Sequence, residues 1–351
     1  MITAKGYAAR KANSKLELWN FERREVGNHD VQIEILYCGV CHSDLAQINN
    51  EWFEGIFPMI PGHEIVGRVV KVGDHVKNFK VGDLAGVGTL VNSCGHCEHC
   101  EDGLEVYCKE GVIATYNNVD KYRDNLPTYG GYSNTIVTDE KFTLRISETL
   151  HLAATAPLLC AGITTYSPLK HWKVGKGHKL AVLGLGGLGH MAVKFGVALG
   201  AEVTVLSTSP KKEADAKKLG VHNFVVTSDP VQIEQVKSSF DFIIDTVSAE
   251  HDFDFYLSLL KVDGVHICVG IPPIGLTIKS VGGSLQMGRR SVVGSAVGGL
   301  PETQEMLNFC AEHNITAEIE LIDIKDIHAA FDRMEKGDVR YRFVIDMETL
   351  K

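Results

Sequence analysis

The stretch Lys179-Leu-Ala-Val-Leu183, followed directly by Gly184-Leu-Gly186-Gly187-Leu188-Gly189, decides the fold of one half of this 351-residue chain. The first five residues form a short apolar run that is typical of a buried strand. Apolar side chains then recur at helical spacing from His190 to Leu199, and Glu202–Leu206 is a second apolar run. A G-x-G-x-x-G motif between a strand and a helix is typical of dinucleotide binding, because its glycines allow a tight turn and a close backbone approach to a pyrophosphate.

Strands and helices continue to alternate after this motif. We expect helices at Lys211–Leu219 and Asp252–Leu260, and strands at Asn223–Val226, Phe240–Thr246 and Gly264–Gly270. This alternation predicts a doubly wound parallel sheet. Nearer the C-terminus the sequence predicts helices at Glu302–Glu312 and Ile327–Lys336 and a final strand at Tyr341–Ile345, and this part of the chain could return to the first domain.

The first 150 residues or so have a different pattern. Val31–Tyr37 alternates apolar and polar residues, as a half-buried strand does. A Val-Gly-Asp turn signal occurs at Val72–Asp74 and again at Val81–Asp83. Short strands at this spacing predict a small barrel or sandwich, with the change of pattern near residue 153.

Four cysteines at Cys94, Cys97, Cys100 and Cys108 have the spacing C-x2-C-x2-C-x7-C. Thiolates this close in sequence can surround one tetrahedral zinc ion. The alternative is a pair of disulfides, which we disfavour because the chain starts Met1-Ile-Thr without an apolar signal segment and its nine cysteines cannot all pair. The other apolar-flanked cysteines have the pattern of small buried side chains without chemistry; they are Cys38, Cys268 and Cys310.

Composition excludes several functional classes. The chain is 44% hydrophobic and 23% charged, so two domains could each bury a sizeable core. Its formal net charge of −9 argues against a general nucleic-acid or anionic-membrane binder. No apolar stretch has the length of a membrane span, and we expect a cytoplasmic protein.

Taken together, these motifs resemble the zinc-dependent medium-chain alcohol dehydrogenases, most closely the cinnamyl alcohol dehydrogenase branch. The resemblance extends over essentially the whole chain, and besides the four-cysteine cluster and the glycine motif it rests on Gly39–Asp44, Pro61–Glu64, Cys160–Thr164, Val269–Pro273 and Asp338–Arg342. It implies a GroES-like, β-rich catalytic domain at residues 1–153 and 296–351. It also implies a Rossmann NADP-binding domain at residues 154–295, so the expected fold class is α/β.

The resemblance implies a catalytic zinc ion held by Cys41, His63 and Cys160. Glu64 lies beside this metal, either as an exchangeable ligand or outside the ligand set. Three protein ligands with an open fourth position are what a catalytic zinc site requires. Asp44 matches the family residue that orients the ligand histidine, and a carboxylate on the second ring nitrogen suits a zinc-bound imidazole.

Ser43 matches the family hydroxyl that passes a proton between the reacting alcohol and the cofactor ribose. Several family members continue this relay with a histidine three positions further along. Ala46 stands there in this chain, which puts the outer part of the relay in doubt.

The segment after Leu206 bears on the choice of cofactor. It reads Ser207-Thr208-Ser209-Pro210-Lys211-Lys212 and holds no acidic residue to bind the ribose hydroxyls of NAD. It is also a good helix start, with Ser209 as N-cap and Pro210 next, and both interpretations can hold. The resemblance implies NADP(H), with Ser207, Thr208 and Lys212 at the added phosphate. The other cofactor contacts that it implies are Thr164, Gly184, Gly186, Gly187, Leu188, Gly189, Ile271 and Arg340.

The resemblance further implies a substrate cleft lined by Trp52 and Leu90, although Trp52 could equally be a core aromatic. The expected function is zinc-dependent oxidation or reduction of primary aromatic or medium-chain alcohols and aldehydes with NADP(H). The alternatives are a polyol dehydrogenase of the same superfamily and a non-catalytic protein that binds zinc and a nucleotide. We expect two zinc ions per chain, a homodimer, and no nucleic-acid or membrane partner.

Overall fold

The computed structural model describes residues 1–123, 125–271 and 277–350. The chain divides into two compact units. The first combines Met1–Ile163 with Gly298–Lys351, and the second is the continuous segment Thr164–Val297. The sequence prediction set these boundaries after residues 153 and 295.

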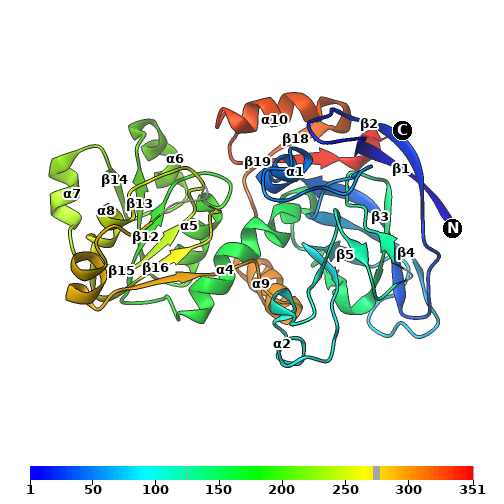
Figure 1. The fold of residues 1–351 in the computed structure, drawn as a ribbon, viewed down its shortest axis with the longest axis horizontal. Helices are drawn as coiled ribbons and strands as arrows, with labels where there is room; N and C mark the ends of the chain where they lie inside the picture. The colour runs from blue at the N-terminus through cyan, green and yellow to red at the C-terminus, as the bar shows by residue number, and fades with distance from the viewer. Residues whose placement is uncertain (124, 272–276, 351) are drawn as a thin grey trace. The chain divides into compact units, whose positions relative to one another are not determined.

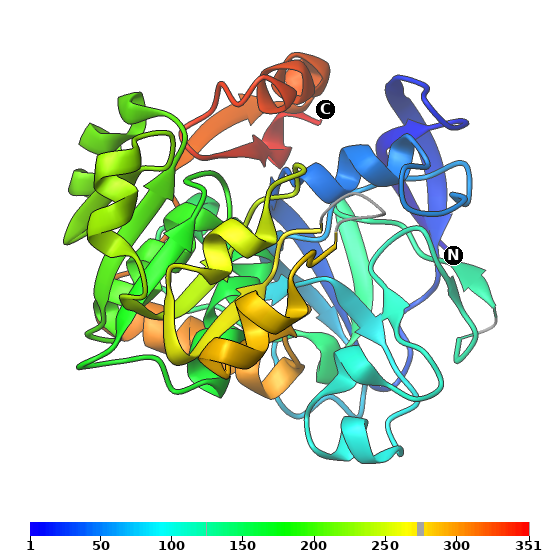
Figure 2. The same cartoon turned by 60° about the vertical axis from the view of Figure 1, so that its left-hand side comes forward.

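The second unit is built on a parallel six-stranded sheet with the order β14-β13-β12-β15-β16-β17 (Figure 1). Its strands are β12 (Lys179–Leu183), β13 (Glu202–Ser207), β14 (Asn223–Val226), β15 (Phe240–Asp245), β16 (Leu260–Cys268) and β17 (Ser291–Gly294). The helices between them are α5 (Gly189–Ala198), α6 (Glu213–Lys218), α7 (Pro230–Val236) and α8 (Phe253–Leu257). This is the predicted doubly wound sheet, and Figure 2 shows its green and yellow strands together.

The strand order changes direction on either side of β12, which pairs with β13 and with β15. Ligands of such sheets bind at the carboxyl ends of the strands, beside this change of direction. The glycine motif begins there, directly after Leu183. The core of the sheet packs apolar side chains such as Ala181, Leu206 and Ile243.

The largest difference from the sequence prediction lies between α8 and β16, where the strand predicted at Gly264–Gly270 begins four residues earlier. The helix expected at Asp252–Leu260 is shorter: α8 ends at Leu257, and Leu260 begins β16 by pairing with Phe240. Leu257, Leu259 and Leu260 are all fully buried. Apolar residues at this spacing fit a helix or a buried strand equally well, so periodicity alone could not place the boundary.

The first unit is dominated by a seven-stranded sheet with the path β11-β5-β4-β3-β19-β18, in which β10 also pairs with β3. Its strands are β3 (Asp30–Gly39), β4 (Ile65–Val72), β5 (Leu84–Val87), β10 (Thr135–Asp139), β11 (Leu144–Arg145), β18 (Ile319–Asp323) and β19 (Arg342–Asp346). The C-terminal strand β19, drawn in red, lies antiparallel to the blue β3 (Figure 1). The C-terminal segment therefore returns to the N-terminal one to complete the sheet.

Shorter elements surround this sheet. The antiparallel pair β1 (Ile2–Ala9) and β2 (Leu16–Arg23) precedes it. The helices are α1 (His42–Ile48), α2 (Glu98–Glu101), α3 (Leu152–Thr155), α4 (Ala161–His171), which crosses the boundary between the units, α9 (Leu300–His313) and α10 (Ile327–Glu335). Among the described residues no single helix is long and apolar enough to cross a membrane; only the bent pair Leu152–Leu159 and Ala161–His171 meets that test, with a 57° break.

Candidate metal centres and cofactor site

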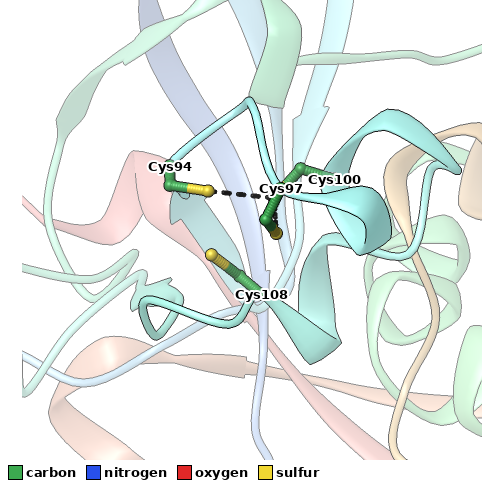
Figure 3. Close-up of side chains that lie close together, drawn as sticks. All are labelled: Cys94, Cys97, Cys100 and Cys108. Carbon is green, nitrogen blue, oxygen red and sulfur yellow. Dashed lines mark hydrogen bonds between the residues drawn. The ribbon is translucent and has the colours of Figure 1, made fainter.

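The four-cysteine cluster forms one compact group of thiols (Figure 3). Cys94 follows the short strand β6 (Leu90–Asn92), Cys97 and Cys100 belong to the start and body of α2, and Cys108 ends the turn Glu105–Tyr107. Their sulfur atoms all lie within 4.8 Å of one another. All nine cysteines are free thiols, so the disulfide alternative is wrong.

The local backbone favours the thiolate form of one member of this cluster, Cys97. Hydrogen bonds to the sulfur from the backbone N–H groups of Lys109 and Cys100 lower the pKa of the Cys97 thiol to about 6. The Sγ atoms of Cys97 and Cys100 are 3.5 Å apart, and those of Cys94 and Cys100 are 3.8 Å apart. Four thiols around one point, with no open position among them, suit a closed tetrahedral zinc site.

A second, fully buried group lies around Cys41, His63, Glu64 and Cys160. Cys41 is the N-cap of α1, and Cys160 follows the helical turn Ala156–Leu159. His63 and Glu64 occupy the loop before β4. One ligand atom from each of the four residues lies within 4.8 Å of the other three, and the Sγ atoms of Cys41 and Cys160 are 4.0 Å apart.

The carboxylate of Asp44 contacts two members of this group, His63 and Cys41, and holds them in place. Its Oδ1 lies 3.2 Å from Nδ1 of His63 and accepts a hydrogen bond of 3.1 Å from the Gly62 N–H. Its Oδ2 accepts hydrogen bonds from the Cys41 N–H at 2.9 Å and the Tyr132 hydroxyl at 3.0 Å. Because Nδ1 of His63 is held by this carboxylate, Nε2 remains as the donor atom for a metal, which is the arrangement that stabilises a zinc-bound imidazole.

Glu64 is completely buried and carries one bound and one free oxygen. Its Oε1 accepts a hydrogen bond from Nη2 of Arg342, and Oε2 has no partner. A side chain at Gly39 would collide with this carboxylate, since a Cβ there would lie 1.9 Å from Oε2. Burial raises the pKa of Glu64 to about 7, against the lowering effect of Arg342.

This donor set fits zinc. Two thiols, one oriented imidazole and one buried carboxylate oxygen without a partner are ligand types that zinc prefers. A buried polar atom left without a hydrogen bond is unusual in proteins, and a cation beside Oε2 of Glu64 would account for it.

Ser43 lies in α1 at the edge of the same group. Its Oγ is 3.5 Å from Sγ of Cys41. Ala46 is fully buried, so the position that carries a relay histidine in several family members has no polar side chain here. The neighbouring Gln47 instead donates a 2.9 Å hydrogen bond to the hydroxyl of Tyr116, whose ring stacks on His63.

The two expected pocket residues differ in exposure. Leu90 lies in β6 and is 7% exposed, whereas Trp52 is 37% exposed. Trp52 packs against Phe53, which is itself exposed. The interpretation of Trp52 as an ordinary core aromatic is therefore wrong.

The glycine motif has the geometry of a phosphate-binding turn. Gly184 has a φ of +87°, and a Cβ on Gly189 would lie only 2.2 Å from the carbonyl oxygen of Gly184. A Cβ on Gly186 would meet no atom within 4 Å, which leaves its backbone open to a ligand. The helix α5 begins at Gly189, so its first N–H groups face the same turn.

The segment after β13 also approaches this turn. Ser207 ends the strand, and the ammonium group of Lys212 donates a 2.9 Å hydrogen bond to the carbonyl of Leu185 inside the glycine motif. Thr208 is exposed, and Pro210 opens a helical turn with Ser209 as its N-cap. Hydroxyl and ammonium groups thus stand where an NAD-binding site carries a carboxylate.

The remaining cofactor candidates differ in exposure and belong to both units. Thr164 is 7% exposed and Ile271 is 54% exposed, both in the second unit. Arg340 is exposed and belongs to the first unit. Of the expected motif Val269–Pro273, Pro272 and Pro273 lie outside the described residues.

Comparison with known proteins identifies the family of the chain. Residues 27–148 match the alcohol dehydrogenase GroES-like domain, and residues 187–312 match the zinc-binding dehydrogenase domain. The chain belongs to the zinc-dependent medium-chain alcohol dehydrogenase family. Within that family it is 50% identical to NADP-dependent alcohol dehydrogenase C 1 of Mycolicibacterium smegmatis, over 100% of each chain.

Two further relatives of this alcohol dehydrogenase are informative. It is 51% identical to a probable mannitol dehydrogenase of Mesembryanthemum crystallinum, over 99% of this chain and 95% of the relative. A solved structure of the cinnamyl alcohol dehydrogenase SbCAD4 from Sorghum bicolor superposes with a TM-score of 0.95 at 44% identity, covering 99% of this chain and 98% of the other. The fold and family predicted from the sequence are confirmed.

The sequence analysis missed three residues that shape the buried metal centre. Arg342 pairs with Glu64, Tyr132 binds Asp44, and Tyr116 stacks on His63. Arg342 belongs to the motif Asp338–Arg342, but no neighbouring residue indicates that it pairs with a carboxylate 278 residues away. Tyr116 and Tyr132 carried no signal, because a single tyrosine between short strands has no distinguishing pattern.

Proposed function

We propose that this protein is an NADP(H)-dependent zinc alcohol dehydrogenase, or aldehyde reductase, that acts on primary aromatic or medium-chain substrates. The observation that carries the proposal is the buried group Cys41, His63, Glu64 and Cys160, with His63 oriented by Asp44. In this proposal Cys41, His63 and Cys160 hold the catalytic zinc, and the four-cysteine cluster holds a structural one. Bound zinc supplies a Lewis acid that polarises the oxygen of the reacting alcohol or aldehyde.

The protein's own residues then have distinct tasks. Asp44 keeps the His63 ring in place and fixes which of its nitrogens faces the metal. Ser43 is the hydroxyl nearest to the thiol of Cys41 in α1, and we assign it the transfer of the alcohol proton. Beyond Ser43 the proton passes to water or to another polar group, since Ala46 cannot carry it.

The cofactor assignment rests on the segment from Ser207 to Lys212. A 2′-phosphate carries negative charge, which a carboxylate at the end of β13 would repel. In its place stand the hydroxyls of Ser207 and Thr208, with the ammonium group of Lys212 held close to the glycine motif. The glycine motif would bind the pyrophosphate at the N-terminus of α5.

The substrate class follows from the apolar candidates Trp52 and Leu90. An apolar wall favours an aromatic body by roughly 25 cal/mol for each Å² that it buries. It offers no partners to the hydroxyls of a polyol, which would lose their hydration. A polyol dehydrogenase is nevertheless the second candidate, because one close relative is named a probable mannitol dehydrogenase.

A substrate panel tests these functions on one enzyme preparation. Cinnamaldehyde, benzaldehyde, mannitol, sorbitol and a secondary alcohol are assayed with NADP(H) and with NAD(H). We expect the highest kcat/KM for the aromatic aldehydes with NADPH. A higher kcat/KM for mannitol or sorbitol would favour the polyol dehydrogenase. An absence of aldehyde-dependent NADPH oxidation in zinc-replete protein would favour a non-catalytic binding protein.

A further inference from the structure

The second unit contains a cluster of metal-ligating side chains, two buried and one partly buried, that the dehydrogenase function does not use. Asp245 ends β15 and lies directly opposite Cys268 at the end of β16. His266 is two residues before Cys268 on the same strand, and residues at this spacing share one face of a sheet. One ligand atom from each of the three residues lies within 4.8 Å of the other two.

His251, just before α8, hydrogen-bonds Asp245 but is not one of the three grouped residues. Its Nε2 lies 2.8 Å from Oδ2 of Asp245, and its Nδ1 lies 2.8 Å from the carbonyl oxygen of Ala249. The hydrogen bond to Asp245 raises the pKa of this imidazole. Burial disfavours the charged form of Asp245, but the hydrogen bonds from His251 and His266 lower its pKa to about 2.

His266 has one ring nitrogen that no hydrogen bond satisfies. Its ring is fully buried, and its Nε2 lies 3.1 Å from the same Oδ2 of Asp245. Its Nδ1 is buried and has no hydrogen-bond partner. Buried ring nitrogens are normally satisfied, and an imidazole in a cluster with a thiol and a carboxylate is a common zinc ligand.

We propose that Asp245, His266 and Cys268 form a zinc site in the second unit, separate from both cysteine-containing centres of the first unit. One thiolate, one carboxylate and one imidazole are ligand types that zinc prefers, and a water molecule completes the tetrahedral set. The thiolate and the carboxylate together balance the two positive charges of the ion. On binding, the proton of the Cys268 thiol leaves to solvent, so one proton is released for each ion bound.

Such an ion would link β15 and β16 at the carboxyl ends of the strands, where sheets of this kind bind ligands. Asp245 is already linked to the end of β16, because its backbone carbonyl accepts hydrogen bonds from the N–H groups of Val269 and Gly270. The next residue, Thr246, borders the glycine motif: its Oγ1 lies 3.1 Å from the position of a Cβ on Gly184. The ion would therefore stabilise the second unit beside its nucleotide-binding turn.

The test is the zinc stoichiometry of the full-length protein. Wild-type protein is dialysed against about 10 µM free Zn²⁺, and bound zinc is counted by elemental analysis. We expect wild type to bind one more ion per chain than the Cys268→Ala variant. The control variant is Cys310→Ala, which removes a buried thiol that lies in the first unit, and we expect it to keep the wild-type count.

A second measurement uses the proton balance. Competition with a chromogenic zinc chelator gives the affinity of the weakest ion at about pH 6 and about pH 8, and we expect it to rise by up to about tenfold per pH unit. His266→Gln should lose the same ion and unfold cooperatively like the wild type. Equal zinc counts in wild type and Cys268→Ala, or an affinity independent of pH, would overturn the proposal.

Discussion

Nη2 of Arg342, in the C-terminal strand β19, donates a hydrogen bond to Oε1 of Glu64, in the loop that enters β4. Both side chains are buried, at 7% and 0% exposure. The guanidinium opposes the effect of burial, which raises the pKa of this carboxyl to about 7. Arg342 therefore favours the charged form of the Glu64 carboxylate, which lies beside the proposed catalytic zinc.

Arg342→Met should destabilise the protein strongly. It leaves the Glu64 carboxylate buried without its cation, which typically costs about 3 kcal/mol of unfolding free energy. Urea denaturation measures this loss. The double variant Glu64→Gln with Arg342→Met removes both charges and should recover most of it. A single variant as stable as the wild type would show that the pair contributes little.

Cys97→Ser and Cys160→Ser should affect different properties: the first should lower thermal stability and the second should abolish activity. Cys97 belongs to the closed four-thiol cluster, whose metal contributes folding free energy, so its loss should mainly lower Tm. Cys160 belongs to the buried centre with Glu64, so its loss should mainly abolish turnover. Each variant should bind one zinc ion fewer than the wild type. If both lost only activity and kept the wild-type Tm, the division into structural and catalytic sites would be wrong.

Ser207→Asp should change the cofactor preference. The new carboxylate would repel the 2′-phosphate of NADPH and could bind the ribose hydroxyls of NADH. A charge-assisted hydrogen bond contributes about 1.5–3 kcal/mol, so we expect kcat/KM with NADPH to fall roughly tenfold to a hundredfold. Ser207→Ala serves as the control, since it removes the hydroxyl without adding charge. Equal efficiencies of the wild type with both cofactors would contradict this assignment.

Ser43→Ala should slow turnover by roughly a hundredfold, because the reacting alcohol loses the hydroxyl that takes its proton. The zinc content and the Tm should not change, since Ser43 is not one of the expected zinc ligands and its Oγ lies 3.5 Å from the Cys41 sulfur. Pre-steady-state NADPH oxidation at several pH values measures the effect on the chemical step. A rate close to that of the wild type would remove Ser43 from the mechanism and leave the zinc ligands unaffected.

The regular parts of the fold were predictable because their signals are local. The strands Lys179–Leu183 and Asn223–Val226 were predicted to the residue, since each is a short apolar-rich run with clear breaks. The boundary at Leu260 was not, since helix and strand patterns coincide there. The pairing of β19 with β3 depends on the sheet as a whole, and the sequence offered only the possibility that the C-terminal segment returns.

The candidate site was predictable mainly through resemblance. Cys41, His63 and Cys160 lie far apart in the sequence, and no single one has a pattern that distinguishes a ligand from a core residue. The structure brings their donor atoms together. The contacts of Arg342, Tyr116 and Tyr132 are long-range, so only the folded chain reveals them. The homodimer and the cytoplasmic location remain predictions.

The discontinuous build of the first unit has a consequence for the order in which the chain can fold during synthesis. Val344 of β19 pairs with Gly39 of β3, so the central strand of that sheet waits for a neighbour made about 300 residues later. The second unit is continuous, and all six of its strands have been made once Gly294 has left the ribosome. The nucleotide-binding unit can therefore be complete while the metal-binding unit still lacks an inner strand and the partner of Glu64.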